Sequence, residues 1–234
     1  MNVIILAAGK GTRMKHLTKN MPKSMLKING RYILEHTLEN LPDEINNIYI
    51  IIGHFGNKIK DYFGNDFKGK KIIYIEEKEN YARGTAAMME LVKGIVFGKM
   101  LVLMGDDLYS KGDLEEMVKV PDWAVLAQKV NHPENVGVLK FDNDNHVIDI
   151  IERPKEYVSN FANTGAYLID DRFFNYPLFK LKNGEYGLPQ TIITASVDIP
   201  LKMIRARFWH SNNKPSDLKK AEKIVIVNKY NLKN

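Results

Sequence analysis

The first hundred residues alternate between short, continuously apolar runs and longer segments in which apolar residues recur every three or four positions. The apolar runs, which we expect to be strands, lie at residues 2–8, 48–52, 71–75 and 100–104. The segments of helical spacing lie between them, at residues 32–41, 57–63 and 84–97. Continuous apolar strands separated by helical crossovers are typical of a mainly parallel sheet that is covered on both faces.

The second half has a different rhythm, in which strand-like segments follow one another through short turns. We expect strands at residues 124–129, 136–141, 146–152 and 163–169, with a turn at DNDN (142–145). Helices are expected at residues 172–180, 189–195 and 215–227. The sequence contains no repeat and no low-complexity linker. We therefore expect a single α/β domain over residues 1–234, a Rossmann-like three-layer α/β/α sandwich with a mixed, mainly parallel central sheet.

The composition excludes several kinds of site and indicates the cellular compartment. The chain has no cysteine, which excludes a disulfide framework, a thiolate zinc site and a thiol nucleophile. The apolar run at residues 3–8 is too short for a signal-peptide core or a membrane span. We therefore expect a cytoplasmic protein with no leader and no membrane partner.

The net charge of +6 is unevenly distributed. Residues 214–234 hold six lysines against Asp217 and Glu222, which places +4 of the total in that segment. A lysine-rich solvated helix face and a phosphate-binding surface both explain this excess. Because the chain contains no recognised nucleic-acid-binding motif, we expect no nucleic-acid partner. A basic balance also suits anionic small substrates, which the field concentrates near the protein.

The loop after the first strand, LAAGKGTRM (6–14), is the most informative segment. It begins at the end of a strand, where open α/β sheets bind ligands. Gly9 and Gly11 allow a sharp turn that brings backbone N–H groups close to phosphate oxygens. The loop lacks the Gly-Lys-Ser/Thr of a Walker loop and the third glycine of a dinucleotide fingerprint. Taken alone, it is also compatible with a simple tight turn.

A second segment, PKSML (22–26), follows about ten residues after Arg13. Together the two segments resemble the sugar-1-phosphate nucleotidylyltransferase family, which includes glucose-1-phosphate thymidylyl- and uridylyltransferases and mannose-1-phosphate guanylyltransferases. The resemblance continues through these short motifs: GTA (84–86), GDD (105–107), VGV (136–138), ERP (152–154) and NTG (163–165). It covers residues 1–170 well and the remainder loosely.

The resemblance implies a specific reaction: a phosphate oxygen of a sugar 1-phosphate attacks the α-phosphorus of a nucleoside triphosphate and releases pyrophosphate. A phosphate monoester has a second pKa of about 6, so the nucleophile is already ionised near neutral pH and needs no general base. It needs relief from anion–anion repulsion, which cations and a divalent ion supply. The six histidines, accordingly, form no recognisable catalytic pattern.

Residue roles follow from the resemblance. Arg13 would hold the β- and γ-phosphates, and Lys23 would lie between the α-phosphate and the sugar phosphate. Mg²⁺ would bind Asp106 at the end of the strand, with Asp107 as a further ligand or a helix cap. The nucleotide would contact Leu6, Ala7, Ala8, Gly9, Gly11, Thr12, Glu79, Gly84 and Thr85. The sugar phosphate would contact Gly137, Glu152, Arg153, Asn163 and Thr164, with Gly165 in the same cleft and Glu185 as a weaker candidate.

The resemblance also assigns the halves of the chain, with a nucleotide-binding half at 1–110 and a sugar-phosphate-binding half at 111–234. In many relatives a glutamine upstream of the GTA motif pairs with uracil or thymine. Residues 76–79 are EEKE and contain no glutamine, and a carboxylate, which only accepts hydrogen bonds, suits guanine better. Relatives with a second, acyltransferase activity carry a left-handed β-helix after this region. Because this chain ends at Asn234, we expect a single activity.

One departure from the family pattern leaves two alternatives open. Ser211 stands where relatives place a second metal-binding aspartate after a tryptophan, here Trp209. A neutral hydroxyl is a poor substitute for a carboxylate, so the chain could bind nucleotide sugars with little turnover. The other alternative is a CTP:phosphocholine cytidylyltransferase, with Trp209 and Phe208 as aromatic residues for the quaternary ammonium. Assembly into a homo-oligomer is compatible with all of these interpretations.

Overall fold

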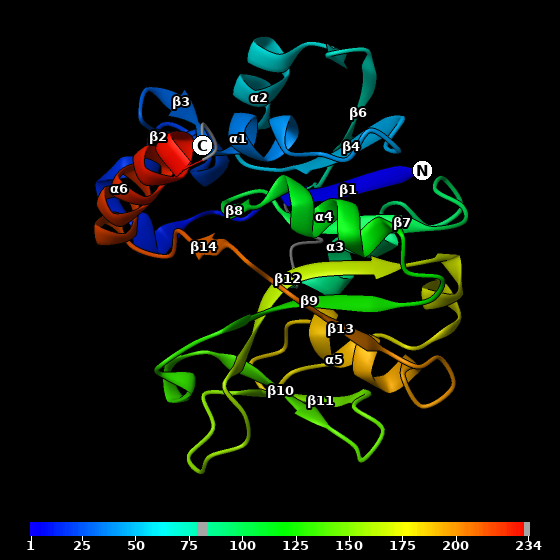
Figure 1. The fold of residues 1–234 in the computed structure, drawn as a ribbon. Helices are drawn as coiled ribbons and strands as arrows, with labels where there is room; N and C mark the ends of the chain where they lie inside the picture. Colours follow the sequence, from blue (N-terminus) through cyan, green and yellow to red (C-terminus); the bar gives the residue numbers. More distant parts are fainter. Residues whose placement is uncertain (79–83, 232–234) are drawn as a thin grey trace.

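The computed structural model describes residues 1–78 and 84–231, and the side chains of residues 225–231 lie outside the description. Its centre is a ten-stranded sheet in the order β11-β10-β12-β7-β1-β4-β6-β5, to which β9 and β13 are added through β12 (Figure 1). Four neighbouring strands run parallel: β6 (Lys70–Glu76), β4 (Asn47–Ile52), β1 (Asn2–Ala7) and β7 (Met100–Met104). β5 (Asp66–Phe67) is antiparallel to β6 at that edge of the sheet.

The other side of the sheet is largely antiparallel. The long strand β12 (Phe161–Ile169) pairs with β7, with β9 (Ala124–Lys129) and with β10 (Gly137–Phe141). β10 in turn forms a hairpin with β11 (Val147–Glu152). β13 (Lys202–Arg205) runs parallel to β9. β12 thus joins the parallel and antiparallel parts of one mixed sheet.

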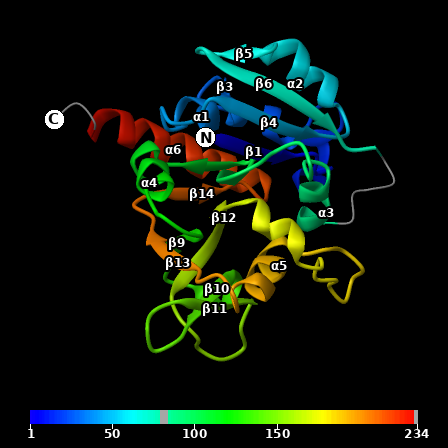
Figure 2. The ribbon, with the colours of Figure 1, turned by 90° about the vertical axis from the view of Figure 1, so that its right-hand side faces the viewer.

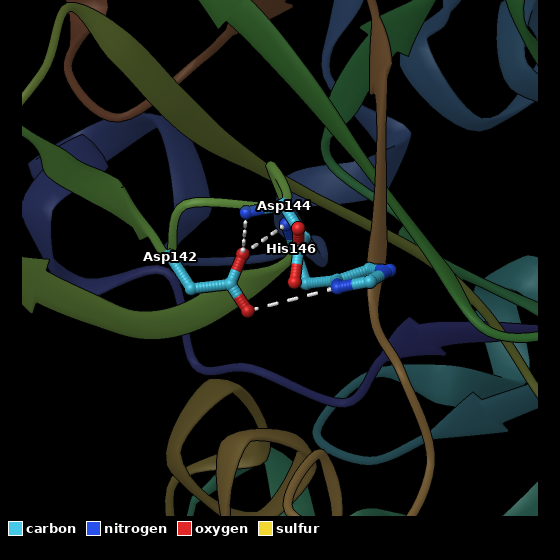
Figure 3. A group of neighbouring side chains, drawn as sticks. All are labelled: Asp142, Asp144 and His146. Atoms are coloured by element: carbon cyan, nitrogen blue, oxygen red, sulfur yellow. Dashed lines mark hydrogen bonds and ion pairs between the residues drawn. The ribbon is translucent and has the colours of Figure 1, made fainter.

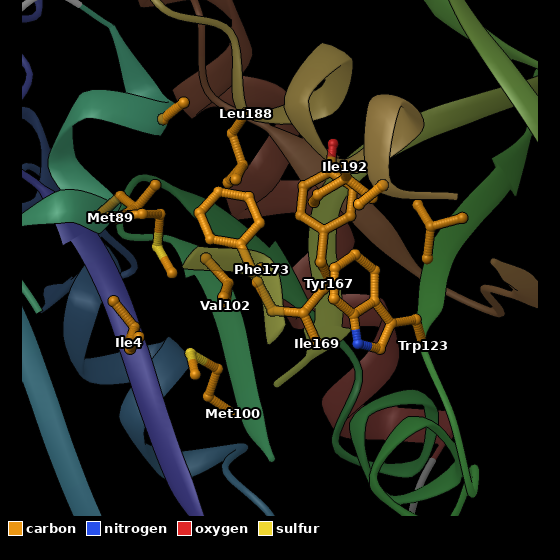
Figure 4. Close-up of a cluster of buried hydrophobic side chains, with 14 of the residues drawn as sticks. Ile4, Met89, Met100, Val102, Trp123, Tyr167, Ile169, Phe173, Leu188 and Ile192 are labelled. Carbon is orange, nitrogen blue, oxygen red and sulfur yellow. The ribbon is translucent and has the colours of Figure 1, made fainter. Parts of the chain in front are cut away.

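The alternation of side chains along the strands produces two separate cores. In β1, Val3 and Ile5 face one core, while Ile4 and Leu6 face the other, as the two-residue period of a strand requires. The first core is covered by α1 (Ile33–Glu39), α2 (Gly56–Phe63) and α4 (Lys111–Val118). The second is covered by α3 (Thr85–Glu90) and α5 (Leu188–Ala195), with Tyr167, Phe173 and Trp123 among its largest members (Figure 4). The expected three-layer α/β/α fold is therefore confirmed.

A third, smaller core connects the N-terminal loops to the last helix. Met14, Leu26 and Ile28 pack with Ala221 of α6 (Pro215–Asn231). The segments that surround it are short: η1 (Thr12–Thr18), η2 (Lys23–Met25), β2 (Lys27–Ile28) and β3 (Arg31–Tyr32). Figure 1 shows α6 beside β2 and β3. This core anchors both sequence motifs of the N-terminal region, 6–14 and 22–26, to the body of the protein.

Several expected elements differ from the structure. The helix expected at 172–180 is wrong: a short 3-10 helix, η4 (Asp171–Asn175), ends before Pro177, whose ring cannot continue a helix. The helix expected at 84–97 is regular only over α3, and Gly94 adopts a positive φ of 73° beyond it. Besides the short pair formed by β2 and β3, two further strand pairs were not expected. β8 (Asp107–Tyr109) pairs with β14 (Trp209–Ser211), and β13 lies beside β9.

Candidate active site

A cleft of about 1150 Å³ opens at the carboxyl ends of the four parallel strands. Each of these strands ends in a segment that lines it, as expected at the edge of an open α/β sheet. The described lining consists of residues 6–14, 23–24, 53–54, 76–78, 84–85, 104–106 and 185–187, with Met88, Leu181 and Asn213. The cleft therefore collects segments that are far apart in the sequence.

Glycines at the strand ends allow these segments to approach each other closely. A Cβ atom built on Gly105 would lie 3.0 Å from Ala7 Cβ, and one built on Gly53 would lie 2.9 Å from the Ala8 carbonyl oxygen. Gly11 has a positive φ of 62°, and its Cβ would come within 3.1 Å of Lys23 Cβ. The glycine of the first motif is thus in direct contact with the lysine of the second. Larger residues at these positions would separate the motifs.

Lys23 and Asp106 form the charged centre of the cleft. The ammonium group of Lys23 pairs with the Asp106 carboxylate, and their side chains are 12% and 29% exposed. Lys23 follows Pro22 at the start of η2, which is fixed by the buried Met25, whereas Asp106 comes directly after β7. Residues 83 positions apart therefore share one site. Partial burial makes such a charge pair stronger than a fully solvated one.

Arg13 lies in the same cleft as this pair. Its side chain is exposed, while the next residue, Met14, is completely buried in the third core. The buried Met14 side chain and its backbone bond to the Gly11 carbonyl oxygen, at 2.9 Å, fix the start of η1. Arg13 is thus a guanidinium group on an anchored turn at the cleft wall. The structure brings Arg13, Lys23 and Asp106 together, as the proposed chemistry requires.

Asp107 has a different environment from its neighbour. Its carboxylate is buried and accepts a hydrogen bond of 2.9 Å from the indole N–H of Trp209. Burial, together with the nearby charge of Asp106, raises the pKa of Asp107 to about 8. Asp107 is absent from the described cleft lining, and its strand β8 pairs with β14. The geometry gives it a packing role, and the prediction that it binds metal gains no support.

Ser211 lies close to the cleft and contacts a residue that lines it. Ser211 pairs in register with Asp107, and its hydroxyl accepts a hydrogen bond from the side-chain amide of Asn213. Asn213 lines the cleft, and its side-chain oxygen lies 3.5 Å from Lys23 Nζ. Mg²⁺ is commonly held by one or two carboxylates together with phosphate oxygens and water. One carboxylate, from Asp106, and a nearby amide oxygen fit an ion that is shared with a bound phosphate group.

Most of the expected nucleotide-binding residues gather in the cleft. Leu6, Ala7, Ala8, Gly9, Gly11, Thr12, Gly84 and Thr85 all line it. Gly84 has a positive φ of 101°, and a Cβ there would overlap the Tyr186 carbonyl oxygen. The Thr85 hydroxyl accepts a hydrogen bond of 3.1 Å from the Leu188 N–H, which holds the start of α5 against the start of α3. Glu79 lies outside the described residues.

The expected sugar-phosphate residues form a separate group at the β10–β11–β12 end of the sheet. Within the described lining of the cleft, none of Gly137, Glu152, Arg153, Asn163 and Thr164 occurs. Two of them are nevertheless adjacent: Gly137 pairs with Glu152, whose carboxylate lies 2.5 Å from the position of a Cβ built on the glycine. Arg153 is exposed and donates its backbone N–H to the Val136 carbonyl oxygen.

Asn163 and Thr164 face different surroundings on the same strand. The Asn163 side-chain amide forms a hydrogen bond of 2.7 Å with the hydroxyl of Tyr167. Thr164 is buried and donates to the Leu126 carbonyl oxygen at 2.8 Å. Burial, and more weakly the charge of Glu152, raises the pKa of Tyr167. The Tyr167 hydroxyl thus holds the Asn163 side chain and lies within reach of the Glu152 charge.

A group of potential metal ligands occurs far from the cleft, in the hairpin between β10 and β11. Asp142, Asp144 and His146 each offer a ligand atom, and these atoms lie within 4.8 Å of one another (Figure 3). One carboxylate oxygen of Asp142 accepts backbone N–H groups from Asp144 and His146, at 2.9 and 2.8 Å. These bonds stabilise the turn that the DNDN sequence predicts. None of the three residues lines the described part of the cleft.

The fold and the cleft define the class of protein: an α/β protein with a glycine-rich, cationic cleft at the carboxyl edge of its parallel strands. Residues 2–196 match the nucleotidyl transferase family model. The chain therefore belongs to the nucleotidyl transferase family, a family of enzymes, as the sequence motifs predicted. In the described part of the chain, no helix is both long and apolar enough to cross a membrane.

Relatives and solved structures agree with this assignment. The chain is 36% identical over 230 residues to the bifunctional protein GlmU of Methanocaldococcus jannaschii, covering 97% of this chain and 54% of that protein. It is 30% identical over 236 residues to a bifunctional sugar-1-phosphate nucleotidylyltransferase/acetyltransferase of Sulfurisphaera tokodaii, covering 100% and 56%. The chain thus spans about half the length of these curated relatives.

The structural comparison covers nearly the whole fold. A crystal structure of a Bacillus anthracis protein, assigned as a glucose-1-phosphate thymidylyltransferase and bound to sucrose, superimposes with a TM-score of 0.83. The identity is 28%, and the match covers 96% of this chain and 94% of that one. The antiparallel half and the parallel half therefore both belong to the shared fold.

Proposed function

We propose that this chain transfers a nucleotidyl group from a nucleoside triphosphate to a sugar 1-phosphate and releases pyrophosphate. The observation that carries the proposal is the convergence of Arg13, Lys23 and Asp106 in one cleft with the glycine-rich loop. Family membership and the relatives described as sugar-1-phosphate nucleotidylyltransferases support it.

The reaction exchanges one phosphorus–oxygen bond for another. An oxygen of the sugar phosphate forms a bond to the α-phosphorus, and the bond from that phosphorus to the bridging oxygen of pyrophosphate breaks. Lys23 neutralises charge between the two reacting phosphates, and Arg13, with its planar fork of donors, holds the departing pyrophosphate. Backbone N–H groups of the loop that contains Gly9 and Gly11 cradle the remaining phosphate oxygens.

Asp106 would hold Mg²⁺ together with phosphate oxygens of the triphosphate. The ion would supply further neutralisation of charge around the α-phosphorus. The Asp106 carboxylate pairs with the Lys23 ammonium group, so the proposed ligand of the ion and the proposed phosphate-binding cation lie side by side in the cleft.

A matrix of nucleoside triphosphates against sugar 1-phosphates, with pyrophosphate detection, tests the proposal. We expect magnesium-dependent pyrophosphate release from one combination, abolished in Arg13→Ala. Phosphocholine belongs in the same panel, although Trp209 bonds to Asp107 and is absent from the described cleft lining. Triphosphate binding without pyrophosphate from any pair would instead support the alternative of a binding protein with little turnover.

Further expectations accompany this proposal. The division into a nucleotide-binding half at 1–110 and a sugar-phosphate-binding half at 111–234 stays a prediction. So do the cytoplasmic location, the absence of a nucleic-acid partner and assembly into a homo-oligomer.

A further inference from the structure

Two adjacent carboxylates lie where β6 ends at the cleft, and they differ in their surroundings. Glu76 is exposed, and its carboxylate pairs with the ammonium group of Lys60. Glu77 is half-buried, and its Oε1 atom is shielded from solvent without a hydrogen-bond donor among the described residues. Burial raises the pKa of Glu77, and the nearby charge of Lys10 opposes the shift. Of the two, Glu77 is the acceptor that the described part of the fold leaves unsatisfied.

The backbone holds Glu77 at the floor of the cleft. Its N–H donates to the Ile52 carbonyl oxygen at 2.8 Å, which continues the pairing of β6 with β4 by one residue. Gly53, at the end of β4, leaves space beside it: a Cβ built there would lie 3.2 Å from Glu77 Oε2 and 3.1 Å from Ala8 Cβ. The Glu77 carboxyl group therefore lies next to the start of the glycine-rich loop. Gly53 has no side chain that would cover it.

Glu77 and the cationic centre lie at opposite ends of the same cleft. The strand order is β6-β4-β1-β7, so three strand spacings separate the end of β6 from Asp106 after β7. At about 4.8 Å per spacing, this separation is roughly 14 Å. The described lining extends from Asp106 past the glycine-rich loop to residues 76–78, so a nucleoside triphosphate whose phosphates lie at Lys23 and Asp106 has room for its base beside the end of β6. Glu77 is then the carboxylate at the base end.

We propose that Glu77 selects the base of the nucleotide and favours guanine, an inference that rests on the proposed function. An ionised carboxylate only accepts hydrogen bonds. Guanine presents two adjacent donors on its pairing edge, the ring N1–H and the exocyclic amino group, and both can reach the two carboxylate oxygens. Uracil and thymine present one N–H between two carbonyl oxygens, which a carboxylate repels. Adenine and cytosine place an amino donor beside a ring nitrogen that is itself an acceptor.

The test is equilibrium binding of GTP, UTP, CTP and ATP by calorimetry, to the wild-type chain and to the Glu77→Gln variant. A well-placed two-point contact to a base discriminates by about 10- to 100-fold, so we expect the wild type to prefer GTP by that factor. Glutamine offers one donor and one acceptor, so Glu77→Gln should weaken GTP binding about tenfold and strengthen UTP binding. Glu77→Asp, which keeps two acceptor oxygens, should retain the preference for GTP with lower affinity.

Glu76→Gln is the matched control, because it makes the same change one residue away at a carboxylate that Lys60 already pairs. We expect it to change the four affinities equally, so that the preference stays the same. Thermal unfolding of each variant confirms that it is folded. A wild-type preference for any other triphosphate, or a GTP preference that survives Glu77→Gln, overturns the inference.

Pyrophosphate release in the same samples separates this inference from the proposed function. Turnover with a base preference that Glu77→Gln leaves unchanged refutes the role of Glu77 and supports the reaction. A Glu77-dependent preference for GTP in binding, without pyrophosphate from any sugar phosphate, supports the role of Glu77 and refutes the reaction. If the wild type binds no triphosphate, both are refuted.

Discussion

The parallel and antiparallel halves of the sheet position their polar side chains in different ways. In the parallel half, every strand ends at the same edge, so that short motifs after β1, β6 and β7 converge in one cleft. In the antiparallel half, Gly137 and Glu152 meet through cross-strand register, and the Asn163 side chain is held by a hydrogen bond to Tyr167 in its own strand. The first arrangement depends on the common direction of the strands and on glycines at their ends, whereas the second depends on exact pairing between strands. Substitutions in the two halves should therefore have different effects.

The largest effect is expected at the cationic centre of the parallel half. Lys23→Ala removes the charge between the two reacting phosphates, and we expect kcat/KM to fall about 10³-fold, which corresponds to about 4 kcal/mol. Steady-state kinetics with pyrophosphate detection measure this. Lys27→Ala is the control, because Lys27 is exposed and lies over the Tyr32 ring, 5.0 Å from its centroid. Equal losses in the two variants would refute a specific role for Lys23.

The next effect concerns the contact between α3 and the segment before α5, which lie next to each other in Figure 2. Gly84→Ala would force a Cβ into the Tyr186 carbonyl oxygen at a positive φ. We expect it to lower the free energy of unfolding by roughly 3 kcal/mol, measured by urea denaturation. Gly94→Ala, also at positive φ but with nothing within 4 Å of its Cβ, should cost about 1 kcal/mol. Equal costs would mean that the close approach at Gly84 relaxes without strain.

A smaller, more selective effect is expected in the antiparallel half. Glu152→Gln keeps the shape over Gly137 but removes the charge, and we expect KM for the sugar phosphate to rise about 10- to 100-fold. KM for the triphosphate should stay constant, because Glu152 is absent from the described lining of the nucleotide cleft. Varying each substrate separately in initial-rate kinetics measures both constants. A parallel rise in both KM values would show that the two halves do not divide the substrates.

The smallest effect is a dependence of stability on pH. Burial raises the pKa of Asp107 to about 8 from 3.8, so between these values the folded protein holds a proton that the unfolded chain releases. Stability from this group is therefore complete below pH 3.8 and is lost as the pH rises toward 8. Because an asparagine side chain does not titrate, the unfolding free energy of metal-free Asp107→Asn should fall less steeply with pH. Urea denaturation of both proteins at a series of pH values measures the two slopes. Parallel curves for the two proteins would contradict the raised pKa.

The sequence predicted those features of the fold that are set by neighbouring residues, and it failed for some of the others. Continuous apolar runs predicted the four parallel strands, because burial on both faces leaves a plain pattern. The helix expected at 172–180 failed, because Pro177 overrides an otherwise suitable spacing. β13 was missed because a four-residue edge strand, Lys-Met-Ile-Arg, shows too little alternation to identify.

The candidate site divides in the same way. Arg13, Lys23 and Asp106 stand in motifs at or near strand ends, and the structure brings them into one cleft. Glu76 and Glu77 are indistinguishable in the sequence, because the partner that separates them, Lys60, is sixteen residues away. Likewise, the burial of Asp107 results from its pairing with a strand about a hundred residues later. The surroundings of these side chains decide their protonation and their accessibility, and the surroundings can be seen only in the folded structure.

The convergence of the two cations and the carboxylate on one ligand can be tested directly by a crystal structure. The crystals should contain Mg²⁺ and a non-hydrolysable analogue of the triphosphate that the protein binds best. We predict that Arg13 and Lys23 both contact phosphate oxygens of one triphosphate, with Asp106 bound to its metal ion. A triphosphate seated elsewhere, or one that contacts neither cation, would contradict the proposed function.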